Sequence, residues 1–199
     1  MEQGGEAYSV NITSQCRKRT NLTAMQIEHL KRIEISLPFV ADLAHAYLYL
    51  YVQTKEPGKM LVLKHYRPHT FFSEVELTGE GAFVSTLEEP LIAAAFAKGK
   101  FIQGQREWRF GINLEMYVQP IKCGNDVIGV VSLETGHSYA NSSNYHQLMD
   151  TALYLLDYAK KPLDKDEFHP MSPGTGIIIA DSNNRIVFAN LSANRIYRA

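Results

Sequence analysis

The stretch AHAYLYLYVQ, residues 44–53, decides the fold. Successive side chains of a strand point to opposite faces, and here both faces are apolar. Such a strand lies at the centre of a sheet that is covered on both sides. We therefore predict a central strand within residues 42–53. One face carries Ala46, Leu48, Leu50 and Val52, and the other carries Tyr47, Tyr49 and Tyr51.

The residues after this strand predict its partner. Glu56–Lys59 contains Pro and Gly and is typical of a turn, so Met60–Arg67 is expected to return as the second strand of a hairpin. Strict alternation divides this second strand into two sets. Leu61, Leu63, His65 and Arg67 form one set, and Met60, Val62, Lys64 and Tyr66 form the other.

The remaining periodicity predicts helices around an antiparallel sheet, an α+β fold. One helix begins at the N-cap Thr23 and is ended by Pro38, and another, over Glu88–Lys98, is stopped by Gly99. The other expected elements are a short strand at Phe101–Gln103, a loop at Glu107–Gly111, a hairpin of Asn113–Lys122 and Asp126–Glu134, and a helix at Ser142–Lys160. Gly129 in the second hairpin would allow close backbone approach.

The chain divides into four segments. Residues 1–20 are polar without a clear period and are predicted to be a flexible arm, and residues 21–160 hold the α+β domain. Residues 161–173 are charged and rich in Pro, which indicates a linker. Residues 174–199 begin a new unit of strand, turn, strand and helix, too short to bury a core alone.

Composition excludes several classes of protein. The 199 residues include 20 Lys and Arg against 21 Asp and Glu, so no basic footprint indicates nucleic-acid binding. No apolar run has the length of a membrane helix, and the N-terminus lacks a signal-peptide pattern. We therefore expect a cytoplasmic protein without nucleic-acid or membrane partners. The two cysteines and seven histidines show no metal-ligand spacing, so no metal is expected.

Residues 174–199 resemble the start of a PAS domain, through Ala180-Asp181, the strand at 185–190 and Ala193-Asn194. The larger domain resembles the GAF-like N-terminal sensor of soluble bacterial two-component histidine kinases, the group of PdtaS and the ethanolamine-utilisation sensor kinases. The residues that carry this second resemblance are Ala41–Leu43, Arg67–Thr70, Glu89–Gly99, Glu107-Trp108, Glu115–Ile121 and Val127–Val131.

The resemblance implies a sensory input module that binds a small molecule in a GAF pocket and signals through a homodimer to PAS and kinase domains. The alternative is a dimerisation or spacer module that binds no ligand. Kinase activity and its ATP would belong to domains beyond residue 199, so this segment is expected to have no catalytic site and no cofactor. The kinase group further suggests a response regulator of the RNA-binding antiterminator type as partner.

Candidate ligand-binding residues follow the return strand and the second hairpin. Arg67 could bind a ligand anion or pair internally with Glu88, Glu89 or Glu115. Trp108 could stack on a ligand or plug the sheet, and Glu115 could bind an amine or a neighbouring cation. The sequence leaves open which sheet face forms the pocket. The full predicted set is Arg67, Thr70, His65, Trp108, Glu115, Tyr117 and Phe72.

Two further expectations concern the cysteines and the outer helices. Cys16 or Cys123 could act as a redox sensor only with a lowered thiol pKa, and their wide separation disfavours an enzyme. The first and last helices of the domain carry Ile27, Leu30, Leu148 and Leu153, among others. This apolar surface either covers the sheet or also forms part of a parallel dimer bundle.

Overall fold

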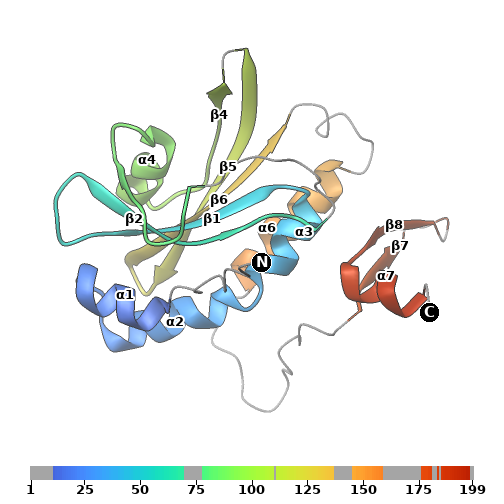
Figure 1. Ribbon diagram of the computed structural model, residues 1–199, viewed down its shortest axis with the longest axis horizontal. Helices are drawn as coiled ribbons and strands as arrows, with labels where there is room; N and C mark the ends of the chain where they lie inside the picture. Colours follow the sequence, from blue (N-terminus) through green and yellow to red (C-terminus); the bar gives the residue numbers. More distant parts are fainter. Residues whose placement is uncertain are drawn as a thin grey trace, which may run out of the picture.

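The structure is a computed structural model, and it describes residues 11–69, 78–109, 111–136, 145–158, 176–180, 183 and 185–197 (Figure 1). Within these residues lies a six-stranded, fully antiparallel sheet in the order β3-β2-β1-β6-β5-β4. The strands are β1 (Tyr47–Gln53), β2 (Lys59–Tyr66), β3 (Phe83–Ser85), β4 (Ile102–Arg109), β5 (Ile112–Cys123) and β6 (Asp126–Gly136). The α+β prediction is confirmed, and β1 is a central strand as expected.

Helices cover both faces of the sheet (Figure 1). Four pack on one face: α1 (Ile12–Arg19), α2 (Ala24–Glu34), α3 (Leu37–Ala44) and α6 (Tyr145–Tyr158). The helix α4 (Pro90–Lys98) packs on the other. A separate two-stranded sheet of β7 (Ile178–Ala180) and β8 (Ile186–Ala189), followed by α7 (Leu191–Tyr197), forms the C-terminal unit. Its strand, turn, strand and helix follow the predicted order.

The two faces have the compositions that alternation along β1 predicted. The face under the four helices, called the helical face, buries Leu48, Leu50 and Val52 together with Leu30 and Leu43 of the helices. The opposite face, called the tyrosine face, lies under α4. It buries Tyr47, Tyr49, Tyr51, Met60, Val62, Met116, Val118 and Val130.

Local signals explain where the helices begin and end. Thr23 caps α2 in a capping box with Gln26, in which each side chain accepts from the other residue's backbone N–H. Gly99 ends α4 at φ 58°, a left-handed conformation that glycine adopts without strain. The prediction that Pro38 only ends the first helix was wrong, because Pro38 lies in the first turn of α3. Backbone N–H groups in that turn have no partner within the helix, so proline loses no hydrogen bond there.

Two segments expected to be irregular are regular. Residues 12–19, assigned to a flexible arm, form α1, because Ile12 and Cys16 are one helical turn apart and are both buried. The loop expected at Glu107–Gly111 is largely the end of β4, so Trp108 lies in a strand. Residues 1–10 and the predicted linker 161–173 lie outside the described residues.

A β-bulge corrects the predicted faces of β2. Leu50 of β1 pairs with Lys64, but the next residue, Tyr51, pairs with Val62, so the register shifts between them. The extra residue reverses the alternation beyond Leu63. Lys64 therefore pairs with a residue of the helical face, and Tyr66 packs against that core, while His65 pairs with Tyr49 of the tyrosine face. The predicted grouping of His65 with Leu61 and Leu63 was wrong.

Gly129 has the role predicted for it. A Cβ atom there would lie 3.2 Å from the backbone oxygen of Tyr51 and 3.1 Å from Cδ2 of Leu30. Its missing side chain thus lets α2 lie close to the sheet. None of the helices among the described residues is long and apolar enough to cross a membrane.

Candidate functional site

A cluster of charged side chains is buried on the tyrosine face. Arg106 comes from β4, Glu134 from β6 and Glu89 from the residue just before α4, so the cluster joins the helix to two strands. One terminal nitrogen of Arg106 lies 2.6 Å from Glu89 Oε1, and the other lies 2.6 Å from Glu134 Oε2. Ser132 Oγ donates to the other oxygen of Glu134 at 3.0 Å. We call these four residues the Arg106 cluster.

Burial dominates the electrostatics of this cluster. The Glu134 side chain is 1% exposed and that of Arg106 is 29% exposed. Burial raises the pKa of Glu134 to about 7, although Arg106 opposes the rise. The pKa of Glu89 is also raised, first by burial, while Arg106 again acts in the opposite direction. Two carboxylates therefore share one guanidinium in a poorly solvated layer.

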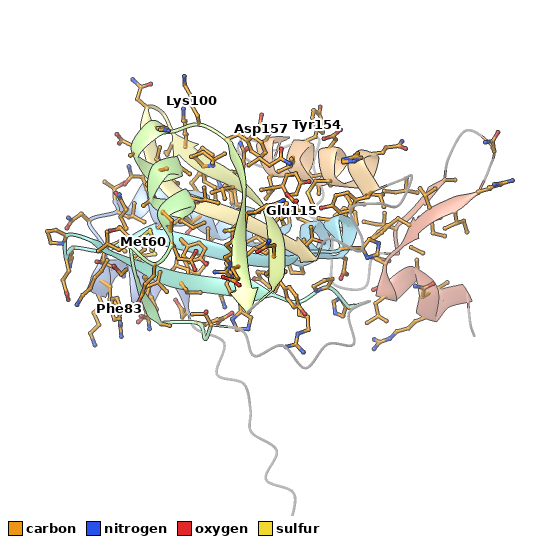
Figure 2. The ribbon with its side chains drawn as sticks, turned by 90° about the horizontal axis from the view of Figure 1, so that it is seen from above. Met60, Phe83, Lys100, Glu115, Tyr154 and Asp157 are labelled. Carbon is orange, nitrogen blue, oxygen red and sulfur yellow. The ribbon has the colours of Figure 1, made fainter. Side chains whose placement is uncertain are left out.

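The tyrosines of β1 lie next to the cluster. Tyr47 is paired across the sheet with Glu134, and Tyr49 with Ser132. The hydroxyl of Tyr49 makes a hydrogen bond with the backbone of Thr78, and its ring lies 6.3 Å from that of His65. The tyrosine face thus combines phenol rings, an imidazole, a guanidinium and carboxyl groups under one helix, and Figure 2 shows Met60 of the same face beside α4.

The structure does not bring the predicted site residues together. His65 lies on the tyrosine face, and Arg67 is close enough to contribute to lowering the His65 pKa, which burial lowers most. Glu115 and Tyr117 share a face as predicted, but Tyr117 is buried in the core of the helical face together with Tyr145 of α6. Thr70 and Phe72, and the side chain of Trp108, lie outside the described residues.

The three glutamates considered as partners of Arg67 each make another contact in the structure. Glu89 binds Arg106, and Glu88 accepts a hydrogen bond from the backbone nitrogen of Ser85 at 2.9 Å. Glu115 accepts from the side-chain amide of Gln105 on the neighbouring strand. These contacts account for both Glu89 and Glu88 within the fold.

Sequence reasoning missed Arg106, Glu134 and Glu89. A signal for Glu134 was present, because it ends the apolar run VIGVVSL of β6, where an unpaired carboxylate would be costly. The same argument was applied to Glu115 alone. Arg106 had no such signal, because its position in a strand was not expected.

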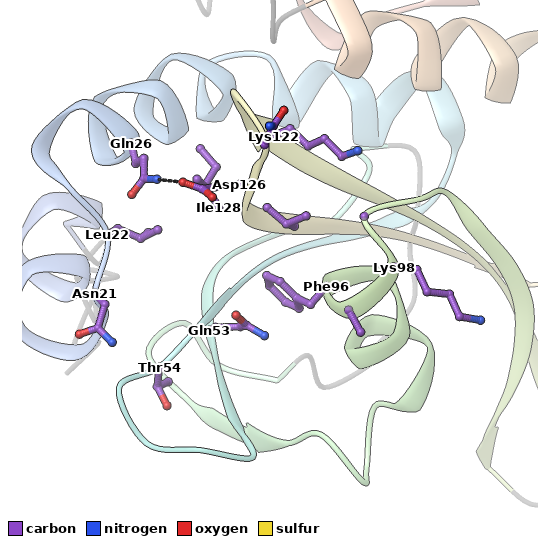
Figure 3. Close-up of a pocket in the computed structure, with 14 residues that line it drawn as sticks. Asn21, Leu22, Gln26, Gln53, Thr54, Phe96, Lys98, Lys122, Asp126 and Ile128 are labelled. Atoms are coloured by element: carbon purple, nitrogen blue, oxygen red, sulfur yellow. Dashed lines mark hydrogen bonds between the residues drawn. The ribbon is translucent and has the colours of Figure 1, made fainter.

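A groove of about 560 Å³ lies at another end of the molecule (Figure 3). The turn of the second hairpin, the end of α4, the end of β1 and the start of α2 surround it. Its hydrogen bond between Gln26 and Asp126 is 3.2 Å long and ties α2 to that turn. The lining includes none of the predicted site residues, and its side chains are largely those of exposed turns.

Among the described residues, neither a reactive cysteine nor a metal-binding cluster offers a second candidate site. Burial raises the pKa of Cys16 to about 11, the opposite of what a reactive thiolate needs. Cys16 also belongs to the core rather than to a mobile arm. Among the residues that the structure describes, no group of three or more His, Cys, Asp or Glu side chains could hold a metal ion.

Comparison with solved structures finds similar folds at low sequence identity. The structure titled "Sensor region of a sensor histidine kinase" is similar with a TM-score of 0.63 and 20% identity, covering 94% of this chain and 68% of that one. The second GAF domain of DevS from Mycobacterium smegmatis gives a TM-score of 0.49 and 13% identity, covering 66% and 90%. A comparison with curated protein sequences gave no match.

The sequence itself identifies the family. Residues 12–152 match the family described as "Histidine kinase PdtaS, GAF domain". The match begins at the first residue of α1 and ends within α6, so it covers the whole six-stranded sheet, the helices α1 to α4 and the first part of α6. The chain therefore belongs to the PdtaS-type GAF family and contains the GAF sensor region of a histidine kinase.

Proposed function

We propose that this chain is the sensory input module of a cytoplasmic histidine kinase and that it binds a small molecule on the tyrosine face, beside α4. The supporting observation is the Arg106 cluster within an otherwise apolar layer. Burying charged groups costs free energy, and clusters of groups with shifted pKa values occur preferentially at functional sites. An apolar floor with a few converging polar groups is the usual form of a ligand site.

The charges of the cluster favour a class of ligand. Arg106 already donates to both Glu89 and Glu134, so its terminal nitrogens are engaged. With both carboxylates ionised, the cluster has one negative charge in excess. A ligand with a positive charge or with several hydrogen-bond donors would balance that excess, whereas an anion would add to it.

Signal transmission is proposed to pass through a homodimer to PAS and kinase domains, with ATP bound by the kinase domain. Large apolar side chains are exposed on the outer helices: Met25 in α2 and Ile35 at its end are 68% and 56% exposed. Tyr154 on α6 is 63% exposed (Figure 2). Such side chains suit a helical dimer interface. A response regulator, of the RNA-binding antiterminator type, would receive the phosphoryl group.

A thermal-shift screen tests ligand binding directly. The panel contains amines, amino acids, nucleotides and cyclic dinucleotides, applied to the wild type and to Glu134→Gln. A ligand present at 100 times its Kd adds about 2.7 kcal/mol to the free energy of unfolding, which gives a clear rise in Tm. We expect a hit among the amines or donor-rich compounds that is lost in Glu134→Gln.

Two matched variants locate the site. Glu115→Ala removes a carboxylate from the opposite side of the sheet and should leave the ligand-induced shift intact, whereas Arg67→Ala tests the rim of the tyrosine face. A hit that survives in Glu134→Gln but disappears in Glu115→Ala would contradict the proposed site. If no compound shifts Tm, the alternative of a spacer module gains support.

A separate variant tests whether the chain senses redox state instead of a small-molecule ligand. It requires a functional thiol, so Cys123→Ser would abolish signalling in the full-length kinase. We expect normal signalling from this variant, because Cys16 is buried with a raised thiol pKa and is therefore unsuited to form a redox pair with Cys123.

A further inference from the structure

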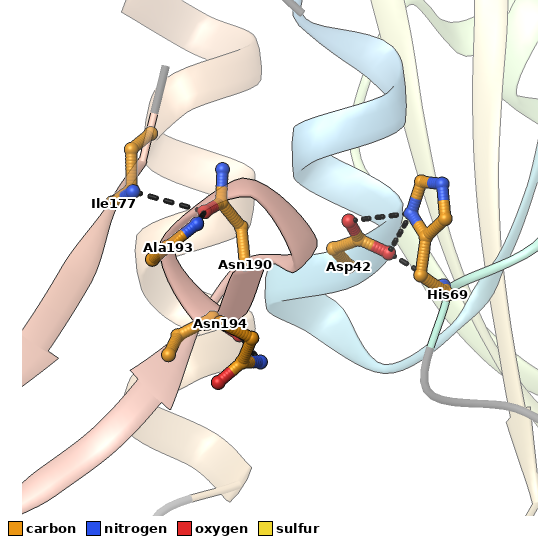
Figure 4. Close-up of polar contacts among 7 residues, drawn as sticks. Asp42, His69, Ile177, Asn190, Ala193 and Asn194 are labelled. Carbon is orange, nitrogen blue, oxygen red and sulfur yellow. Dashed lines mark hydrogen bonds and ion pairs between the residues drawn. The ribbon is translucent and has the colours of Figure 1, made fainter. Parts of the chain in front are cut away.

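Helix α3 contacts two parts of the molecule that are far apart in sequence (Figure 4). One is residues 67–69, which directly follow β2 with its tyrosine-face residue His65 and which we call the rim. The other is the C-terminal unit of β7, β8 and α7. Both contacts use side chains within or just after one eight-residue helix, so a shift of α3 would affect both.

Asp42 makes the contact with the rim. Its buried carboxylate accepts a hydrogen bond from the backbone nitrogen of His69 at 2.7 Å. The Nδ1 atom of the His69 ring lies 2.9 Å from the second carboxylate oxygen. Because His69 follows β2 by three residues, Asp42 fixes the point at which the chain leaves the sheet. The neighbouring His65 belongs to the tyrosine face.

Phe39 and His45 make the contact with the C-terminal unit. Phe188 of β8 packs edge-on against Phe39, with 5.7 Å between ring centroids and an interplanar angle of 73°. Its ring also lies 6.4 Å from that of His45. Phe188 is buried in the core of the helical face. We call Phe39 and His45 the Phe188 socket.

A second connection joins the socket to the Arg106 cluster. The hydroxyl of Thr135, the residue after Glu134, donates to the backbone oxygen of His45 at 3.4 Å. His45 has φ 45° and ψ 45°, a left-handed conformation that is unusual for a residue with a Cβ. Strained backbone of this kind often occurs where a structure switches between states.

The C-terminal unit has its own internal support. The side-chain oxygen of Asn190 accepts from the backbone nitrogens of Ile177 at 3.0 Å and Ala193 at 2.9 Å (Figure 4). Asn190 thus joins the start of β7, the end of β8 and the first turn of α7. The unit can therefore dock or detach at Phe188 without losing these bonds.

We propose that α3 is the output element of the sensor and that the Phe188 socket is its latch. Movement of the rim would act on Asp42 through His69, change the socket and so alter the docking of the C-terminal unit. This proposal rests on the proposed sensory function. A ligand shifts the latch only by the difference between its affinities for the docked and released states.

The test uses amide hydrogen exchange of the ligand-free protein. Exchange at residues 177–180 and 186–189 reports the docking of the hairpin, and exchange at the central amides of β1 reports global unfolding. Phe39→Ala, which leaves the C-terminal unit's own residues intact, should speed hairpin exchange at least tenfold relative to β1. His69→Ala does not touch the hairpin, yet it should speed that exchange severalfold.

Glu28→Gln is the matched control, because it removes an exposed charge on α2 and should leave hairpin exchange unchanged. The proposal is wrong if Phe39→Ala has no effect, since no latch then exists. It is also wrong if Phe39→Ala speeds hairpin exchange but His69→Ala does not. In that case the contact between His69 and Asp42 is not coupled to the docking of the hairpin.

Ligand measurements separate this proposal from the proposed function. Coupled sites affect each other reciprocally, so Phe39→Ala should change the Kd of any tyrosine-face ligand by 5- to 150-fold, the usual range of such coupling. An unchanged Kd would overturn the latch while leaving ligand binding established. If no ligand is found, the proposed function fails, and hydrogen exchange still decides whether rim and hairpin are coupled.

Discussion

The two faces of the sheet are both buried, but they are built from different chemistry. The helical face is filled mainly by apolar side chains from the strands and from four helices, and its buried charged residue Lys64 is paired with Glu34 and Glu80. The tyrosine face lies under α4 and includes the Arg106 cluster among its apolar side chains. An apolar layer could be filled more simply, because replacing a buried ion pair by apolar side chains is often neutral or stabilising.

This difference indicates a division of labour. The helical face contributes mainly stability, since most of its buried side chains are apolar and pack against the sheet. The tyrosine face keeps groups that cost free energy to bury, and natural proteins usually keep such groups where they bind or switch. Substitutions on the two faces should therefore differ in their dependence on pH and on ligand as well as in size.

The largest effect is expected on the helical face. Leu30 is fully buried in α2 and lies against Gly129 of β6. Leu30→Ala should lower the free energy of unfolding by about 3–5 kcal/mol, because it removes buried methyl groups and leaves a cavity. Urea denaturation measures this loss. The size of this loss should not change from about pH 5 to about pH 8, because Leu30 does not titrate.

The next largest effect is expected on the tyrosine face. Arg106→Leu leaves Glu134 and Glu89 buried without their cation and should cost about 3 kcal/mol at neutral pH. The loss should shrink at lower pH, because protonated carboxyl groups do not need the guanidinium. A loss of equal size at every pH would mean that Arg106 contributes only packing. Arg106→Lys is the control that keeps the charge.

Residues of the helical face could be predicted well from the sequence. Apolar periodicity identified β1, α2, α4, α6 and the stop at Gly99, because each depends on neighbours within one or two turns of chain. Gly129 was also recognised. The main local errors were α1 and β4, where the polar residues between Ile12 and Cys16 and the charges around Trp108 concealed regular structure.

The site could be predicted only in part, because long-range pairing determines it. The bulge opposite Leu50 and Tyr51 moved His65 to the tyrosine face, and alternation within β2 alone contains no trace of that shift. Arg106, Glu134 and Glu89 are far apart in the chain and meet only once the sheet order is known. Glu134 could have been suspected from its apolar neighbours, but its partner could not.

The third effect is a pH dependence on the tyrosine face. The pKa of Glu134 is about 7 in the folded protein against an ordinary value of 4.5. A raised pKa means that the folded state binds the proton more tightly, so this contribution to stability is complete below pH 4.5 and is lost as pH rises to 7. The loss should be roughly 2–3 kcal/mol.

Glu134→Gln isolates this contribution. The difference in free energy of unfolding between wild type and variant, measured by urea denaturation across that pH range, should change with pH in the stated direction. Carboxyl groups outside the Arg106 cluster titrate equally in both proteins and cancel. A difference that stays constant with pH would show that Glu134 keeps an ordinary pKa, and the division between the two faces would then rest on geometry alone.

The smallest effect concerns one hydroxyl group on the tyrosine face. Tyr49→Phe keeps the buried ring and removes only the hydrogen bond to the backbone of Thr78, so it should cost about 1 kcal/mol of stability. If the tyrosines serve only to fill the layer under α4, this small loss is the whole consequence. If the face binds a ligand through its hydroxyl groups, ligand affinity should fall further than stability, by about tenfold for a lost hydrogen bond. Titration calorimetry with a ligand from the screen, compared with the melting temperature of the same variant, therefore separates a tyrosine that packs from a tyrosine that recognises.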